Sequence, residues 1–535
     1  MSVEETLVAE APPPVIETWK PKHNPWAIAL VVTMATFMEV LDTSIANVAL
    51  PHIAGNLSAG LDESTWVLSS YLVANAVVLP ISAWLATRFG RKRFYMACVV
   101  LFGISSFLCG LAPSLSVLVF CRVLQGLGGG GLAPSEQAIL ADTFPPQKRG
   151  MAFAIYGMAV VLAPAIGPTL GGYITDNFDW RWIFFINVPV AIVSLILTSR
   201  LVEDPPYLKA AREKSFTVDY VGLGLIAIGV GALQVVLDKG QREDWFTSSF
   251  INSFTAIAVV CIVTALIWEY HHAHPVIDVR LFRNKNFAIS CVMMFMLGAA
   301  LFGATVLLPQ FLQTLMGYSA QDAGMVLSPG AIVIILMLPL IGRLVSRVDA
   351  RYLIGIGFTA TSLGLMHMTE LYLGLDFRTI VMLRVWQMAG VAFLWVPIQT
   401  MVYVDIPPDK NNNVSGMTNL ARNLGGSVGI STVETFLARR TQFHQNVLAA
   451  HTSRFDPAFQ SSVSALAHKF GASGFDHAAA TRMAYSRVYE SVQSQAGMLA
   501  YIDTIWIFSL VCLLVAPLAF LMKKNKAGRA PASAH

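Results

Sequence analysis

The feature that most constrains the fold of this chain is a series of fourteen apolar runs, each long enough to cross a lipid bilayer. A bilayer core about 30 Å thick requires roughly 20 apolar residues in a helix. Of the 535 residues, 55% are hydrophobic and only 13% are charged, against about 25% charged in a soluble domain. The sequence therefore excludes a water-soluble enzyme and predicts an all-α integral membrane protein. The runs cover about 26–50, 66–86, 94–111, 115–140, 151–174, 182–199, 219–237, 250–268, 287–312, 323–344, 352–371, 380–403, 414–437 and 501–522.

Cofactor signals are weak throughout the chain. The six cysteines lie inside apolar runs and form no CxxC or framework spacing, so neither disulfides nor a metal site are predicted. The glycine run 128–131 follows no strand and precedes no Gly-Lys-Ser/Thr, and no Walker motif is present. We therefore expect no metal, nucleotide or nucleic acid to bind.

Lysines and arginines in the predicted loops orient the spans. Segment 1–25 is acidic and proline-rich, as in a cytoplasmic tail, and is not a signal peptide. With this tail inside, most of the 36 basic residues fall in cytoplasmic segments, as the positive-inside rule requires. An even number of spans then places the C-terminal tail, 523–535, inside as well.

An internal repeat divides the chain into two halves. Three stretches recur in the same order at a nearly constant offset: Val48–Pro51 with Val306–Pro309, Ala83–Arg88 with Gly342–Arg347, and Arg122–Gly128 with Arg384–Gly390. Two parallel six-helix halves are the plan of many transporters, whose substrate cavity lies between the halves. The predicted segments are the N-terminal half 26–200, an inserted helix pair with linkers 201–280, and the C-terminal half 281–522.

Four motifs carry a family resemblance. Ala83–Lys92 resembles the loop after the second helix of the major facilitator superfamily, Arg122-x-x-Gln125-Gly126 its helix-4 motif, and Ala163–Gly172 its antiporter motif. Leu41–Pro51 resembles the first-helix signature of the fourteen-spanner drug:proton antiporters, and the similarity continues through Asp179–Pro189. One departure is that Ala83 and Thr87 replace the usual Gly and Asp of the loop motif.

The resemblance implies a proton-coupled exporter of hydrophobic or amphipathic compounds in the inner membrane, a multidrug efflux antiporter that gives antibiotic resistance. It further implies a tripartite efflux system, with a periplasmic membrane-fusion adaptor and an outer-membrane channel as partners. The proton gradient would be the driving force, without a cofactor. A dedicated exporter of one metabolite, fatty acid or siderophore is the alternative, and a passive facilitator or receptor on the same fold is a further one. An antiporter-like respiratory subunit would need lysines within its spans, and these are absent.

Charged residues within the spans are the candidates for proton coupling. A charge at the bilayer centre costs about 2.5–3.5 kcal/mol on insertion scales, so each needs a reason. Asp42 lies near the middle of the first run, with Glu39 on the same helical face. Arg122 in the fourth run would act on Asp42 across the cavity, as the resemblance implies. A purely structural role is the alternative for each of the three.

Other polar or small residues are candidates for the cavity and its gates. For the substrate cavity they are Gln125, Glu136, Asn419, Arg422 and Asn423, with Glu136 expected at the cytoplasmic mouth. Small and proline residues of the antiporter motif allow close, bendable packing, which favours a gate over ordinary packing. These are Ala163, Pro164, Gly167, Pro168, Gly171 and Gly172, and the cytoplasmic loop motif contributes Arg88, Gly90 and Arg91.

Two segments lie outside the repeat. The inserted pair carries acids and bases only near its ends, so we expect both helices to be peripheral to the transport path.

Segment 438–500 is far longer than a usual connection. Apolar residues at helical spacing in 459–468 and 480–489 predict a helical hairpin in the periplasm. Its role is either a lid on the pump or a docking element for the adaptor.

Overall fold

The computed structural model describes residues 21–206, 208, 219–273, 275–450, 452–453 and 455–524. Over these residues the protein is entirely helical, without a β-strand. The N-terminal half contains α1 (Pro25–Asn56), α3 (Trp66–Phe89), α4 (Arg91–Gly110), α7 (Pro146–Asn177) and the short α2 (Leu61–Ser64). Two further spans are each broken in two, α5 (Leu115–Gly129) with α6 (Leu132–Thr143), and α8 (Trp182–Phe185) with α9 (Asn187–Leu201).

The C-terminal half repeats this arrangement. It contains α13 (Lys285–Thr314), α14 (Ala320–Leu344), α15 (Ala350–Met368), α16 (Phe377–Val402), α17 (Asn411–Ala449) and α19 (His477–Val515). Twelve of the described spans are long and apolar enough to cross a membrane. The other two, α15 and α17, pack within the bundle against α16 and α13. The prediction of a fourteen-helix, all-α membrane protein with two six-helix halves is therefore confirmed.

Local sequence explains where several helices begin. The side chains of Asn24, Ser114 and Asp376 each accept a hydrogen bond from a backbone N–H in the first turn of the helix that follows. Such caps satisfy donors that a helix start otherwise leaves unpaired. Ser319 and Asp322 form a reciprocal capping box at the start of α14. These caps set the helix ends independently of the membrane.

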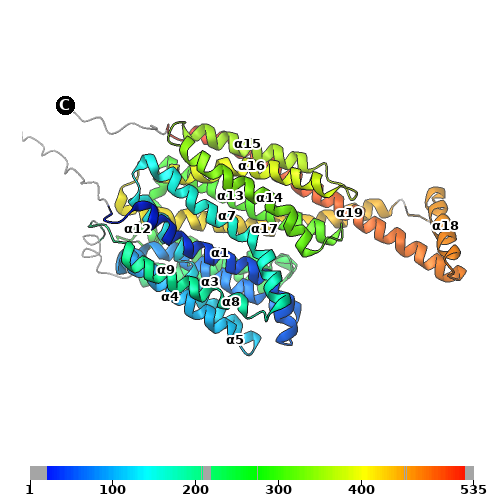
Figure 1. Ribbon diagram of the computed structural model, residues 1–535. Helices are drawn as coiled ribbons and strands as arrows, with labels where there is room; N and C mark the ends of the chain where they lie inside the picture. Colours follow the sequence, from blue (N-terminus) through cyan, green and yellow to red (C-terminus); the bar gives the residue numbers. More distant parts are fainter. Residues whose placement is uncertain are drawn as a thin grey trace, which may run out of the picture.

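The two halves meet along two seams. On one seam α7 packs against α14 and α16, and on the other α3 and α6 pack against α17. Figure 1 shows the halves side by side, with α13–α16 above α1, α3, α4 and α9. At the α7–α14 seam two glycines bring the backbones together, because a Cβ on Gly150 would fall 2.7 Å from the carbonyl oxygen of Gly342. The halves are thus in direct backbone contact there.

The inserted helices occupy different positions. The second, α12 (Ser249–His271), packs on α11 and exposes most of its side chains, as expected of a peripheral helix. The first, α11 (Tyr220–Lys239), lies across the α3–α17 seam and contacts both helices. Gln234 exchanges hydrogen bonds with Ser427 of α17, and Lys239 donates to Thr65 at the start of α3. Helix α11 is therefore not simply an outer helix.

Helices also fill the long segment before the last span. Helix α17 continues to Ala449, and α18 (Pro457–Ala472) packs against the N-terminal part of α19. The turn between α18 and α19 contains Gly474 at φ +98°, a conformation that favours glycine. Figure 1 shows α18 standing clear of the bundle, at the end opposite the first residues of α1.

The glycine contact between the halves gives a test of the fold. Gly150→Leu should place a side chain between α7 and α14, so that this end of the seam no longer closes. We expect transport in proteoliposomes to fall at least ten-fold, while the amount of inserted protein stays unchanged. Gly172→Leu on the same helix is the matched control, because a Cβ there would meet no atom within 4 Å. Equal transport by the two variants would contradict the role of this contact.

Candidate transport site

A buried ion pair links the first and fourth spans. Arg122 Nη1 of α5 lies 2.5 Å from Asp42 Oδ2 of α1, and the two side chains are 0% and 1% exposed. The Arg122 Nε also donates to the Val67 carbonyl (3.0 Å), and its guanidinium lies 4.4 Å from the centre of the Tyr71 ring. The sequence had suggested that the two charges face each other across a cavity. In the structure they are in direct contact. A pair this deeply buried is held by attraction in a low-dielectric medium.

Neutral amides complete the environment of Asp42. Gln125 Nε2 donates to Asp42 Oδ1 (3.0 Å), and the Gln125 side-chain oxygen accepts from Arg122 (2.8 Å). Asn187, at the start of α9, donates to Asp42 Oδ1 (2.7 Å) and to the hydroxyl of Ser106 (3.0 Å). Gln125 therefore belongs to the Asp42 network and does not line an open cavity. Side chains from two further helices, α5 and α9, therefore hold this one carboxylate of α1.

Sequence reasoning missed two residues of this network, Asn187 and Tyr71. Asn187 is a polar residue inside an apolar run that was noted only for its family resemblance. A buried amide in a span needs a partner, so its polarity was the available signal.

The repeat is also visible in three dimensions, since Arg384 donates to Gln387 (2.7 Å) as Arg122 does to Gln125. The repeat offset places Ala300 where the N-terminal half has Asp42.

Glu39 lies beside this network and faces the α3–α17 seam. Its Oε1 accepts hydrogen bonds from Asn75 (2.8 Å) and from the Tyr71 hydroxyl (3.3 Å). Asn75 in turn accepts from Asn423 of α17 (3.3 Å), so the contact crosses from one half to the other. Arg422 lies with its guanidinium 5.3 Å from the Trp395 ring centre of α16. Glu39, Arg422 and Asn423 thus gather where the halves meet.

Glu136 occupies a separate buried position. Its carboxylate accepts hydrogen bonds from the Thr36 backbone N–H (3.1 Å) and hydroxyl (2.5 Å) on α1, and from the Tyr95 hydroxyl (3.4 Å) on α4. We expected Glu136 at the cytoplasmic mouth of the cavity. That prediction is wrong for this conformation, because the residue is 0% exposed. The adjacent Gln137 pairs its amide with that of Asn419, with bonds of 2.8 and 3.3 Å across the seam. Asn419 is therefore an interface residue in this conformation.

The loop motif forms a polar latch between the halves. Gly90 has φ +91°, and Arg91 begins α4 with its side chain 1% exposed. Arg91 pairs with Asp142 of α6 and donates from Nε to Asn412 of α17 (2.7 Å). Asn412 also donates to the hydroxyl of Thr87 (3.3 Å), at the position where the motif usually has Asp. Arg88 is half-buried in the last turn of α3.

The antiporter motif connects the Asp42 helix to the other half. A Cβ on Gly167 would lie 2.6 Å from the Cβ of Ser44, and one on Gly171 would lie 3.3 Å from Ile45 Cα, so α7 packs closely on α1. On the other side, a Cβ on Gly324 of α14 would lie 4.0 Å from the Cβ of Pro168, and Ala163 is buried. Pro164 interrupts the backbone bonding within the helix, and Gly172 faces open space. Helix α7 therefore touches α1 on one side and the C-terminal half on the other.

Comparison with known proteins agrees with this arrangement. Residues 32–430 match the family described as Major Facilitator Superfamily. The chain belongs to the major facilitator superfamily. A relative in this superfamily is the multidrug export protein EmrB of Escherichia coli, 38% identical over 440 residues, which cover 82% of this chain and 85% of that protein.

Another relative and one solved structure extend the comparison. The fatty acid resistance protein FarB of Neisseria gonorrhoeae is 38% identical over 428 residues, 80% of this chain and 84% of that protein. The structure of the proton:xylose symporter XylE has a TM-score of 0.59 at 15% identity, covering 94% of this chain and 97% of that one. At that identity the structural likeness shows the fold alone. This chain is thus a multi-pass membrane transporter of the superfamily.

The latch between the halves yields a prediction. Asn412→Ala removes one hydrogen bond to a charged group and one to a hydroxyl, worth together about 2 kcal/mol. This should shift the equilibrium toward separation of α3 and α17 by about thirty-fold. Distances between spin labels at the exposed Phe89 and at Asp409 should then broaden to longer values. Asn446→Ala, in the same helix but beyond the seam, is the control, and an unchanged distance distribution in Asn412→Ala would contradict the latch.

Proposed function

We propose that this protein exports hydrophobic or amphipathic compounds in exchange for protons. The observation that carries the proposal is the Asp42 carboxylate, which is buried in the first span and held by Arg122, Gln125 and Asn187. Transport against a gradient requires a group whose charge differs between the two access states. An aspartate is such a group, whereas its arginine and amide partners do not titrate under physiological conditions. The EmrB relative supports export of drugs as the direction of transport.

Protonation of Asp42 would act through its partners. A proton on the carboxyl group cancels the negative charge that Arg122 faces, and an unpaired buried charge costs several kcal/mol. Arg122 lies over the Tyr71 ring, and the Tyr71 hydroxyl bonds to Glu39. Glu39 is therefore the nearest alternative acid along this path, and it lies at the seam between the halves. A proton at Asp42 would in this way change contacts where the two halves separate.

Helix α7 carries the change to the other seam. Ser44 and Ile45 follow Asp42 by less than one helical turn and pack on Gly167 and Gly171 of α7. Farther along α7, Tyr156 stacks on Trp395 of α16 with ring centres 6.2 Å apart. Since side chains this close leave no free space, a shift of α1 must displace α7. We infer that α7 gates access by moving against α14 and α16.

The assignment of Asp42 has a direct test. Asp42→Asn keeps the size of the side chain and one acceptor oxygen for Arg122 but cannot take up a proton, so we expect the protein still to fold and insert. We expect drug-dependent proton flux in proteoliposomes to be lost, with drug binding reduced by less than ten-fold. Asp176→Asn, at an exposed end of α7, removes a carboxylate in the same way and serves as control. Undiminished proton flux in purified Asp42→Asn protein would contradict the assignment.

We further propose that the protein lies in an inner membrane with both ends of the chain in the cytoplasm. The first residues of α1 and the end of the last described helix lie at the same end of the bundle (Figure 1). The loops at this end carry Arg91, Lys92 and Lys523, in agreement with the positive-inside rule. Helix α18 then stands on the periplasmic side, and the latch of Arg91 closes the cytoplasmic side.

The helical segment around α18 is the candidate docking element for a periplasmic membrane-fusion adaptor, which would connect to an outer-membrane channel. Several aromatic side chains of this segment are exposed, and the segment lies beyond the helical bundle. They are Phe455, Phe475, Tyr485 and Tyr489, of which Phe455 is 95% exposed. Exposed aromatic residues grouped on a projecting element are typical of protein interaction surfaces. This supports docking over a lid, because α18 packs on α19 and not on the bundle mouth.

Shortening this segment separates transport from assembly. Replacing 452–482 by a tight turn leaves the Asp42 site and both seams intact, so proton-coupled transport in liposomes should be retained. Adaptor pull-down and drug resistance in cells should both be lost. Double replacement of Tyr485 and Tyr489 by Ser should weaken pull-down at least ten-fold without altering the helices, and replacement of exposed Ser461 and Ser462 by Ala is its control. Full adaptor capture by the shortened pump would place the contact elsewhere.

A dedicated exporter of fatty acids is the second candidate. It is favoured by the FarB relative, which is as similar in identity as EmrB. A cation at the seam, Arg422 beside Trp395, would suit an amphipathic anion. Competition of a long-chain fatty acid and a cationic dye for transport in the same liposomes distinguishes the two. Transport of the fatty acid alone would favour the dedicated exporter.

A further inference from the structure

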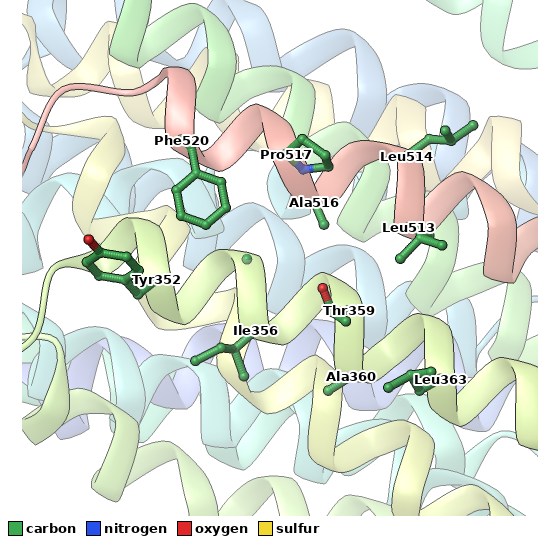
Figure 2. Close-up of a pocket in the computed structure, with 11 residues that line it drawn as sticks. Tyr352, Ile356, Thr359, Ala360, Leu363, Leu513, Leu514, Ala516, Pro517 and Phe520 are labelled. Atoms are coloured by element: carbon green, nitrogen blue, oxygen red, sulfur yellow. The ribbon is translucent and has the colours of Figure 1, made fainter.

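An apolar groove runs along the outer face of the C-terminal half, between α15 and the end of the last span. Its volume is about 790 Å³. Figure 2 shows its two walls, with Tyr352, Ile356 and Leu363 on α15 and Leu513, Leu514 and Phe520 on the opposite wall. The second wall is α19 together with η4 (Ala516–Leu521), a 3-10 helix. This groove belongs neither to the Asp42 network nor to a seam between the halves.

Small residues make this face a recess. Gly355 has no side chain, and Ala360 and Ala516 have only a methyl group, whereas large side chains stand at the rim. Leu363, Leu514 and Tyr352 at the rim are 64%, 66% and 54% exposed. In a membrane-spanning bundle such exposed apolar side chains face lipid. A recess of this kind holds an acyl chain in more contacts than the convex faces of neighbouring helices can offer.

One end of the groove is polar and basic. The rings of Tyr352 and Phe520 meet there with centres 6.0 Å apart, and Arg351 donates to the Met522 carbonyl (3.2 Å) just beyond them. Lys523 and Lys524 follow directly and are exposed. Arg343 and Arg347 precede α15 and are exposed as well. Two of the cations have acidic partners, since Arg351 pairs with Asp349, and Lys523 lies 3.1 Å from Asp405.

We propose that this groove binds an anionic phospholipid, with an acyl chain between α15 and η4 and the headgroup phosphate at the basic end. The charge complementarity is with the net negative charge of the headgroup, because clustered Lys and Arg at the membrane surface recognise anionic headgroups.

A second copy of the chain fits the groove less well than a lipid does. Copies in one membrane are parallel, so a two-fold dimer on this face would bring the two basic ends together. Like charges placed opposite each other oppose such a contact. A second apolar groove, lined by Val99, Gly103 and Phe107 of α4 with Ala191 and Leu195 of α9, has a smaller volume of about 290 Å³. No charged residue lines it, so it provides an internal comparison.

A bound lipid would fasten the end of the chain to α15. The η4 wall contains Pro517, which lacks a backbone donor, and 3-10 helices have weaker hydrogen-bond geometry than α-helices. Contacts from an acyl chain to both walls would therefore stabilise the last turn of the span. We expect phosphatidylglycerol to raise the midpoint of thermal unfolding of the purified protein more than phosphatidylcholine does.

Native mass spectrometry of delipidated, detergent-solubilised full-length protein tests the proposal, with dioleoyl phosphatidylglycerol and dioleoyl phosphatidylcholine as probes. We expect one phosphatidylglycerol molecule to bind at least ten-fold more tightly than phosphatidylcholine. Lys523→Gln and Lys524→Gln should each weaken the binding of phosphatidylglycerol about five-fold, which is the effect of one basic residue near an anionic surface. Phosphatidylcholine binding should not change in either variant. Asp405→Asn should strengthen phosphatidylglycerol binding, because it frees Lys523.

A variant that fills the groove tests the part of the proposal that places the acyl chain there. Ala360→Phe should weaken phosphatidylglycerol binding at least ten-fold, whereas Val260→Phe on the convex face of α12 should not. Equal binding of the two lipids to the wild-type protein would overturn the headgroup assignment. Unchanged phosphatidylglycerol binding in Ala360→Phe would overturn the site. The site would also be overturned if the same spectra showed that Ala360→Phe loses a protein dimer and not a bound lipid, because a second copy of the chain would then be the occupant of the groove. Neither result depends on transport, so the proposed function is tested separately.

Discussion

The buried contact between Asp42 and Arg122 is the interaction on which the rest of the structure depends. Two opposite charges within a membrane are tolerated only when they are paired and their remaining polar atoms are satisfied. Gln125 and Asn187 donate hydrogen bonds to Asp42, and the Val67 carbonyl accepts one from Arg122, so that α1, α3, α5 and α9 meet at one point. The N-terminal half is therefore organised around a single carboxylate. Any change in its charge must be felt by four helices.

The seams between the halves are built from weaker and more numerous contacts. The Gln137–Asn419 amide pair, the Arg91–Asn412 bond and the backbone contact of Gly150 with Gly342 each cross from one half to the other. Contacts of this kind stabilise a closed arrangement but break one at a time, which suits halves that must separate in each cycle. Helix α11 adds bonds to both halves at one seam, so the two seams are not equivalent.

The outer surface has its own organisation. One end of the bundle gathers basic residues next to the apolar groove of α15 and η4, and the other end projects α18 with its exposed aromatic side chains. The proposed lipid groove and the proposed docking element thus lie at opposite ends of the molecule. The transport site lies between them and shares residues with neither. Variants of the surface should therefore leave the Asp42 network unperturbed, as the separate tests require.

The sequence by itself determined the fourteen helices and the repeat, and it singled out Asp42 and Arg122 as charges within spans, because apolar length and the rarity of charges within spans are local properties. Only the tertiary structure decided which residues touch. Asn187 contacts Asp42 from 145 residues away, and Asn412 contacts Arg91 from 321 residues away. Helical periodicity reports which face a side chain shares with its own neighbours, but not which distant helix packs against that face. For the same reason Glu136 proved to be buried and α11 proved to lie across a seam.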